Sequence, residues 1–171
     1  MSSKLDEKDQ AILQLIQENS KLTANQIAKK INTPITTVFA KTKRMEQLGI
    51  IKQYRAILNA EKLNLGTSAF ILASVSYTTT KTDGAPVSQR DVAEEIARLP
   101  EVQEVHIITG DWDLLVKLRA ENVESVGRFV VDKLRLIKGL EKTLTCMVFE
   151  TVKETTSLPQ PLKRTEKQTK P

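Results

Sequence analysis

Residues 23–49, TANQIAKKINTPITTVFAKTKRMEQLG, contain two helix starts and one helix end, and they decide the predicted fold of the N-terminal region. Thr23 and Gln26 have the spacing of a capping box, in which each side chain satisfies a free backbone donor at a helix start. Thr33-Pro34 predicts the next start, with threonine as N-cap and proline as the first helical residue. Gly49 predicts the end of that helix. The stretch therefore predicts two helices joined by a tight turn.

A further helix is expected before this stretch. Asp6 can cap its start, and Asp9 would then stand at the third helical position, near the positive end of the helix dipole. Apolar residues recur at helical spacing from Ile12 to Ile16. Three capped helices with a short second turn predict a helix-turn-helix domain over residues 1–50.

The third helix of this domain has two different faces. Its expected buried stripe comprises Val38, Thr42, Met45 and Leu48. The opposite face is small, polar and basic, which suits the major groove of DNA, because hydroxyl groups and cations reach base edges and phosphates there. The candidate DNA-binding residues are Thr36, Thr37, Ala40, Lys41, Lys43 and Arg44. Phe39 is expected to contact the second helix rather than a thymine methyl group.

The charge distribution separates the front of the chain from its middle. Residues 1–62 carry 11 Lys and Arg against 6 Asp and Glu, whereas residues 63–153 carry 11 against 13. A basic front suits a polyanion. The alternative is a three-helix bundle whose polar face is only solvated, but three capped helices together with a basic excess favour DNA binding.

The second half of the chain alternates strand and helix patterns. Strands are expected over residues 69–77, 102–109, 113–119 and 140–152, with helices capped by Ser88 and Asn122 between them. This βαββαβ order predicts an α+β domain with a ferredoxin-like sheet and both helices on one face. His106, Thr143, Thr145, Met147 and Phe149 are expected on the uncovered face. An uncovered, partly apolar face predicts a second subunit.

The domain layout follows from these patterns. We expect a helix-turn-helix domain over residues 1–50, a strand-like linker over 51–65 and the βαββαβ domain over 66–153. The tail over 154–171 is rich in Lys, Thr and Pro and is expected to be disordered.

Several classes of protein are excluded or disfavoured. The chain has no apolar run long enough for a membrane span and no signal-peptide pattern at its start. One Cys and one His cannot form the usual zinc site, and no phosphate loop or nucleophile motif is present. We therefore expect a cytoplasmic, nucleoid-associated protein that is not an enzyme and needs no metal or cofactor.

The turn at Gly110-Asp111-Trp112, followed by Asp113, has two interpretations. Its carboxylates can simply shape the hairpin. Alternatively, the backbone amides and Asp113 can receive the carboxylate and the ammonium group of an amino acid, which is a minimal recognition set for such a ligand.

Four motifs together resemble the Lrp/AsnC, or feast/famine, family of transcription regulators. They are Leu5-Asp6-x-x-Asp9-x-x-Ile12-Leu13, Ile27-Ala28, Arg44-Met45-Glu46-x-x-Gly49-Ile50-Ile51 and Thr109-Gly110-Asp111-Trp112-Asp113-Leu114. The resemblance covers about residues 5–153. It implies that the first domain binds double-stranded DNA and that the βαββαβ domain forms homodimers, which often assemble into octamers.

The resemblance also implies a small amino-acid-like effector between subunits, near the turn. The implied effector-binding residues are Gly110, Asp111, Asp113, Thr143 and Thr145. A homodimer predicts a pseudo-palindromic operator. Pro34, Lys41, Thr42 and Met45 depart from the residues usual in the family, which leaves the operator sequence undefined. The alternative function is a metabolite-binding or enzyme-regulatory protein that does not act on DNA.

Overall fold

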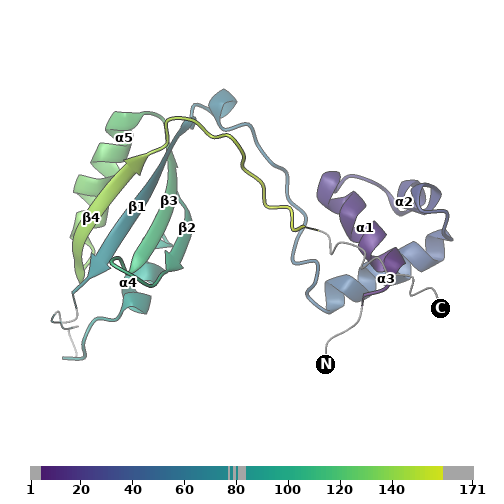
Figure 1. Cartoon of the computed structure of the whole chain (residues 1–171), viewed down its shortest axis with the longest axis horizontal. Coiled ribbons are helices and arrows are strands. Elements are labelled where there is room, and N and C mark those ends of the chain that lie inside the picture. The colour runs from purple at the N-terminus through teal and green to yellow at the C-terminus, as the bar shows by residue number, and fades with distance from the viewer. Residues whose placement is uncertain (1–4, 77, 79, 81–83, 160–171) are drawn as a thin grey trace, which may run out of the picture. The chain divides into compact units, whose positions relative to one another are not determined.

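A computed structural model of the chain describes residues 5–76, 78, 80 and 84–159 (Figure 1). The chain divides into two compact units. One consists of Met1–Ile57 with Lys153–Pro171, and the other of Leu58–Val152. The boundary at residues 57 and 58 falls within the linker expected from the sequence.

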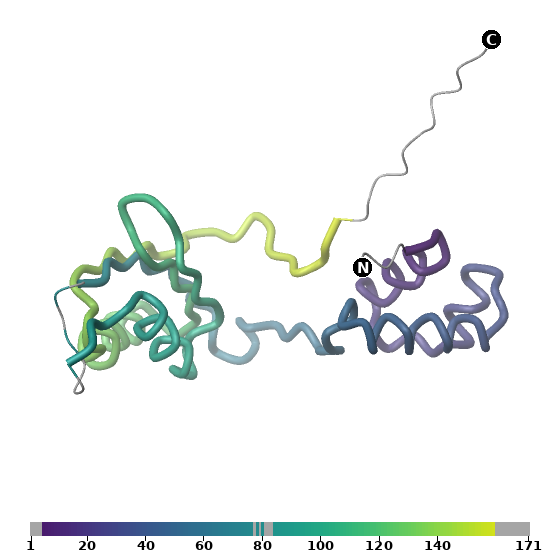
Figure 2. Tube along the Cα trace, turned by 90° about the horizontal axis from the view of Figure 1, so that it is seen from below, coloured from purple at the N-terminus to yellow at the C-terminus, as the bar shows by residue number. Residues whose placement is uncertain are grey.

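The N-terminal unit contains α1 (Glu7–Glu18), α2 (Ala24–Lys30) and α3 (Ile35–Gln47), which Figure 2 follows from purple to blue. The predicted capping box of Thr23 with Gln26 is present at α2, and the predicted N-cap Asp6 forms a capping box with Asp9 at α1. The core is small and consists of Ile12, Ile27, Ala28, Val38 and Met45. The predicted helix-turn-helix fold is confirmed.

Two details of α3 differ from the prediction. Pro34, not Thr33, is its N-cap, because the Thr33 hydroxyl donates to the Ile31 carbonyl at 3.1 Å instead of capping the helix. Leu48 was predicted to be buried but is 51% exposed. The chain turns at Gly49, with φ +68°, and Ile51 packs against the core in its place.

Residues 51–58 form no strand, so the strand-like character expected of the linker is not found there. A strand needs a neighbour to satisfy its backbone groups, and none of the four strands found in the described residues pairs with this segment. Ile57 and Leu58 lie exposed in it, at 84% and 68%.

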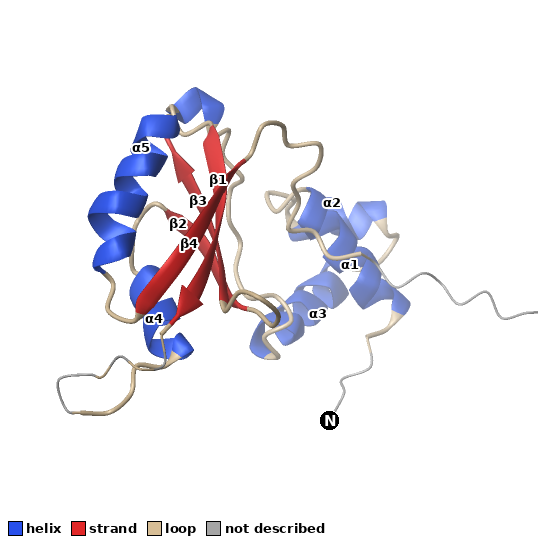
Figure 3. Ribbon diagram, turned by 60° about the vertical axis from the view of Figure 1, so that its left-hand side comes forward, coloured by secondary structure: helices blue, strands red, loops and turns tan. Residues whose placement is uncertain are grey.

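The C-terminal unit contains β1 (Thr67–Val75), α4 (Gln89–Ile96), β2 (Val102–Ile107), β3 (Leu114–Ala120), α5 (Val123–Arg128) and β4 (Leu140–Met147). A π turn over Phe129–Lys133 and a short 3-10 turn over Leu134–Leu136 extend α5. The sheet has the order β2-β3-β1-β4 with antiparallel neighbours. Both helices lie on one side of it (Figure 3). The predicted ferredoxin-like α+β fold is confirmed.

Alternation along the strands divides the sheet into a covered and an open face. Ala69, Ile71 and Ala73 of β1 are fully buried under the helices, where Ile96 and Leu134 join the same hydrophobic core. Two rows of side chains cross the open face: His106–Leu115–Leu72–Leu144 and Glu104–Lys117–Phe70–Cys146.

The predicted faces of β4 are largely wrong. Thr143, Thr145 and Met147 pair with Ala73, Ile71 and Ala69, so they lie on the helix-covered side. Only His106 of the five predicted residues lies on the open face within the sheet. Phe149 is fully exposed beyond the end of β4, which stops at Met147. The register of β4 against β1 fixes this parity, and a shift of one residue exchanges the faces.

Candidate DNA-binding and effector sites

A cluster of charged side chains ties α1 to α3. Asp9 is fully buried, and its carboxylate accepts hydrogen bonds from Lys41 Nζ at 3.2 Å and from Arg44 Nη2 at 2.7 Å. It also accepts from the backbone N–H of Asp6 at 2.9 Å, as part of the capping box. One carboxylate therefore joins the start of α1 to two cations of α3.

Asp6 completes this cluster from the helix cap. Its carboxylate accepts from Lys41 Nζ, and this bond, with the backbone N–H of Asp9, lowers the pKa of Asp6 to about 2. The same ion pair raises the pKa of Lys41 above its usual value. Lys41 and Arg44 thus direct their charge toward α1, although the Arg44 side chain remains 46% exposed.

The other predicted DNA-binding residues lie on the outer side of α3. Thr36, Ala40 and Lys43 are exposed, and Thr37 is half-buried. Lys43 has no ion-pair partner among the described residues. Small and hydroxyl side chains beside a cation are the combination that base edges and phosphates can accept.

Phe39 lies beside this surface. Its side chain is 64% exposed and does not belong to the hydrophobic cluster of the three helices, so packing on α2 does not account for it. Ile35, one turn earlier, is 49% exposed. Glu46, the only acidic residue of α3, accepts a hydrogen bond from the Tyr54 hydroxyl at 2.8 Å. Burial and this bond raise the pKa of Tyr54 to about 12.

The turn between β2 and β3 holds the predicted effector residues of the hairpin. Asp113 is engaged within the chain: its carboxylate accepts from the Val75 backbone N–H at 2.8 Å and from the Gln89 side-chain amide. Gly110 has φ +122°, a conformation that favours glycine, and Asp111 is exposed. Asp113 therefore ties β1, β3 and α4 together beside an exposed turn.

The structure brings only part of the predicted effector set together. Thr143 lies opposite Ala73, which lies opposite Leu114 at the start of β3. Strands are about 4.8 Å apart, so Thr143 is about 10 Å from the β3 end of the turn. Thr145 is two residues further along β4. The Lys142 ammonium lies 5.7 Å from the centre of the Trp112 ring, so a cation–π contact also joins β4 to this turn.

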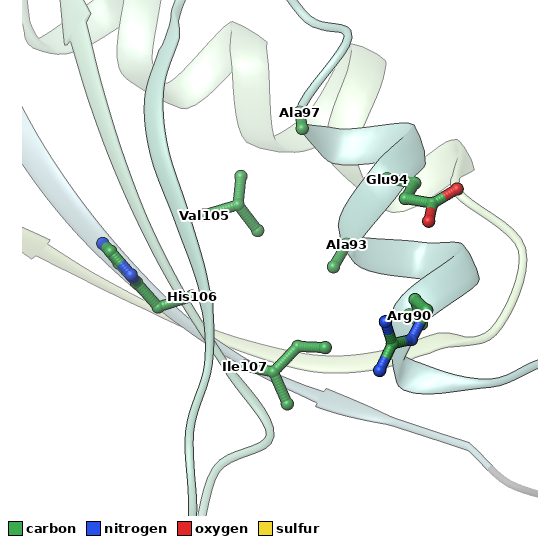
Figure 4. A pocket seen from close by; sticks show the side chains of 7 residues that line it. All are labelled: Arg90, Ala93, Glu94, Ala97, Val105, His106 and Ile107. Atoms are coloured by element: carbon green, nitrogen blue, oxygen red, sulfur yellow. The ribbon is translucent and has the colours of Figure 1, made fainter. Parts of the chain in front are cut away.

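A shallow hollow of about 430 Å³ lies elsewhere, between α4 and the outer edge of β2. Its lining consists of Arg90, Ala93, Glu94, Ala97, Val105, His106 and Ile107. Figure 4 shows Val105 and Ile107 directed toward α4 and His106 directed away from it. None of the predicted effector residues lines this hollow.

Sequence reasoning missed two contacts. The side-chain amide of Gln89 donates to Asp113 from 24 positions away along the chain, and no local pattern indicates this contact. The local pattern around Asp9 indicates only a residue at a helix start, because nothing in it signals partners 32 and 35 positions later. Among the described residues, no group of three His, Cys, Asp or Glu is placed to hold a metal ion. No described helix is long and apolar enough to cross a membrane.

A three-helix unit with an exposed small, basic helix face, joined to a ferredoxin-like unit, is the architecture of a DNA-binding regulator with a ligand-binding domain. Residues 5–52 match the winged helix-turn-helix DNA-binding domains, and residues 69–158 match the Lrp/AsnC ligand binding domain. The chain belongs to the Lrp/AsnC family and is a DNA-binding transcription regulator.

Similar proteins agree with this assignment. An HTH-type transcriptional regulator of Pyrococcus abyssi is 46% identical over 154 residues, covering 90% of this chain and 99% of the relative. The regulator FL11 of Pyrococcus furiosus is 34% identical over 155 residues, covering 91% and 96%. A transcriptional regulator from Neisseria meningitidis, solved in complex with L-Met, has a TM-score of 0.82 at 31% identity, covering 91% and 97%.

Proposed function

We propose that the outer face of α3 reads the operator. Thr36, Thr37 and Ala40 would face the base edges, and Lys43 would contact phosphate. Two observations support this proposal. The face is largely exposed, and the neighbouring cations Lys41 and Arg44 are held by ion pairs to Asp9. The single observation that carries the proposal is that Lys43, on the third helix of the helix-turn-helix unit, is exposed and has no ion-pair partner among the described residues.

Lys41 and Arg44 have a different proposed part. Their bonds to Asp9 would fix the angle at which α3 packs against α1. Lys41 and Arg44 would thus affect DNA binding indirectly, by setting the position of α3. The exposed part of Arg44 leaves room for an additional phosphate contact. Loss of either side chain should therefore reduce the stability of the unit as well as its affinity for DNA.

We further propose that the protein acts as a homodimer through the open sheet face. That face carries an apolar patch of Phe70, Leu72, Leu115 and Leu144, and the Lys117–Glu104 ion pair borders the patch beside Phe70. An apolar centre with a polar rim is typical of a subunit interface. Two-fold symmetry would then present two α3 helices to two half-sites, so the operator would be pseudo-palindromic. Octamers would require further contacts between dimers.

An amino-acid-like effector is proposed for the turn that begins at Gly110. The regulator from Neisseria meningitidis was solved with L-Met, and the matched domain is a ligand-binding one. Because Asp113 is already bonded to Val75 and Gln89, we assign it to positioning the turn. Exposed Asp111 and the backbone amides would contact the ligand itself. Thr143 is the nearer of the two threonines to this turn.

The proposal also covers where the protein acts and whether it is an enzyme. The chain acts on DNA in the cytoplasm, associated with the nucleoid, and catalyses no reaction. A metabolite-binding protein without DNA binding, the alternative considered from sequence, has no observation that favours it over a regulator.

In vitro selection from a random duplex library tests the operator proposal. The full-length protein should select a pseudo-palindrome whose half-sites are about 10 bp, or a multiple of that, apart. Thr37→Ala should select a relaxed consensus, whereas Lys138→Ala, an exposed lysine of the C-terminal unit, should select the original one. A consensus without symmetry would contradict the dimer, and an unchanged Thr37→Ala consensus would remove that residue from readout.

The effector proposal is tested by calorimetric titration with each of the twenty amino acids at millimolar concentration. At least one should bind, and Asp111→Ala should weaken it without lowering thermal stability. If none binds to the wild type, the turn is structural and the amino-acid effector is rejected.

A further inference from the structure

Ile35 and Phe39 form an apolar ridge on a side of α3 that does not pack into the core of its unit. Of the large apolar residues of this helix, Val38 and Met45 are fully buried, whereas Ile35 and Phe39 are 49% and 64% exposed. Ile35, Phe39 and Lys43 follow one another at intervals of four residues and therefore share one face of the helix. The ridge is not part of the core of its own unit.

The surroundings of the ridge indicate which partner it fits. Thr36 and Ala40 lie directly beside it, and Lys43 continues it toward the end of the helix. The acidic residue nearest to Lys43 on the helix, Glu46, is hydrogen-bonded to Tyr54. An apolar protein surface would gain little from this small, basic margin. Double-stranded DNA accepts the cation at its phosphates and the small side chains at its base edges.

The major groove offers one apolar group to such a ridge. The C5 methyl group of thymine projects into the groove, and apolar side chains, phenylalanine included, contact it. The ring of an exposed phenylalanine has the area to cover one or two methyl groups. Its burial against DNA would remove from water an apolar surface that folding leaves exposed.

We propose that Phe39, with Ile35 beside it, reads thymine methyl groups in the major groove and so determines part of the operator sequence. This inference rests on the proposal that the outer face of α3 meets DNA. The contact of Phe39 and Ile35 with methyl groups would add to the base readout by Thr36 and Thr37. It would select thymine at positions where the hydroxyl groups of these threonines alone leave the base ambiguous. Lys43 supplies affinity at the phosphates, and Phe39 and Ile35 add to the discrimination that Thr36 and Thr37 provide.

The test removes the methyl group and the ring separately and together. A duplex selected by the full-length protein is synthesised again with deoxyuridine in place of thymidine at one position at a time. For the wild type, one or two positions in each half-site should show about a fourfold increase in Kd, which corresponds to about 0.8 kcal/mol for one buried methyl group. For Phe39→Ala, deoxyuridine at those positions should have no further effect.

The controls separate this inference from the proposal beneath it. Phe39→Leu should keep part of the methyl response, and Val123→Ala, an exposed apolar residue of α5, should keep all of it. If Lys43→Ala weakens binding but no position couples to Phe39, the apolar readout is wrong and the DNA-binding face stands. If Lys43→Ala also has no effect, α3 does not meet DNA in this way and both are wrong.

Discussion

Replacing Asp9 by asparagine removes the charge that joins α1 to α3 while keeping the size of the side chain. Asp9 is fully buried and holds Lys41 and Arg44 at 3.2 Å and 2.7 Å. Net hydrogen bonds to charged groups contribute about 1.5–3 kcal/mol each. The Arg44 side chain is 46% exposed and can be solvated after the change, so its share is discounted. We expect a loss of about 2–4 kcal/mol in the free energy of unfolding of the N-terminal unit.

Two spectroscopic probes can assign this loss to one unit. Helices α1, α2 and α3 contain 12, 7 and 13 residues, against 8 and 6 in α4 and α5 and 5 and 3 in the two turns that extend α5, so the larger part of the helical circular dichroism at 222 nm comes from the N-terminal unit. Trp112, the only tryptophan, reports on the C-terminal unit by fluorescence. In Asp9→Asn the dichroism midpoint should fall by at least about 10 °C, and the fluorescence midpoint should not change.

The matched control is Glu7→Gln, which removes a carboxylate from the same helical turn. Glu7 is exposed, so only its interaction with the helix dipole is lost, about 0.3–1 kcal/mol. If Asp9→Asn and Glu7→Gln lower the midpoint equally, the ion pairs do not hold the helices together and the reasoning is refuted.

Further variants test other parts of the account. Gly139→Ala should destabilise the C-terminal unit by about 1–3 kcal/mol in urea denaturation followed by Trp fluorescence, because φ is +89° and a Cβ would lie 2.6 Å from Val87 Cγ1. Leu72→Lys should convert the dimer to monomer in light scattering, and a persistent dimer would place the interface elsewhere. Asp113→Ala should cost about 1–3 kcal/mol in the same unit, because the Val75 N–H loses its acceptor. The lowered pKa of Asp6 stabilises the fold above its ordinary value near 3.8, and this contribution is lost as pH falls through about 2. The melting temperature of Asp6→Asn should therefore fall less between pH 5 and pH 2 than that of the wild type.

Local signals in the sequence predicted the helices and, apart from the N-cap of α3, their starts. The caps at Asp6, Thr23 and Ser88 depend on residues three positions apart, so they can be predicted from the sequence, and each forms a capping box in the structure. The ferredoxin-like order was predictable for a similar reason, because each strand and helix has its own period.

Contacts between distant residues were not predictable. The parity of β4 depends on its register against β1, and one position decides whether Met147 faces the helices or the open side. The bonds of Asp9 to Lys41 and of Asp113 to Gln89 join elements that are distant in sequence. For the DNA-binding face, the composition was visible, but which cations are held internally required the packing of α1 on α3.

The salt dependence of DNA binding tests the central claim most directly, namely that the outer face of α3 contacts the duplex. The slope of log K against log salt counts phosphate contacts, and each one contributes about one unit. For Lys43→Ala on the selected duplex, the slope should be shallower by about one for each half-site bound, with lower affinity for all sequences. Lys138→Ala should keep the wild-type slope. A Lys43→Ala protein that is folded by circular dichroism and retains both the affinity and the slope of the wild type would contradict the account.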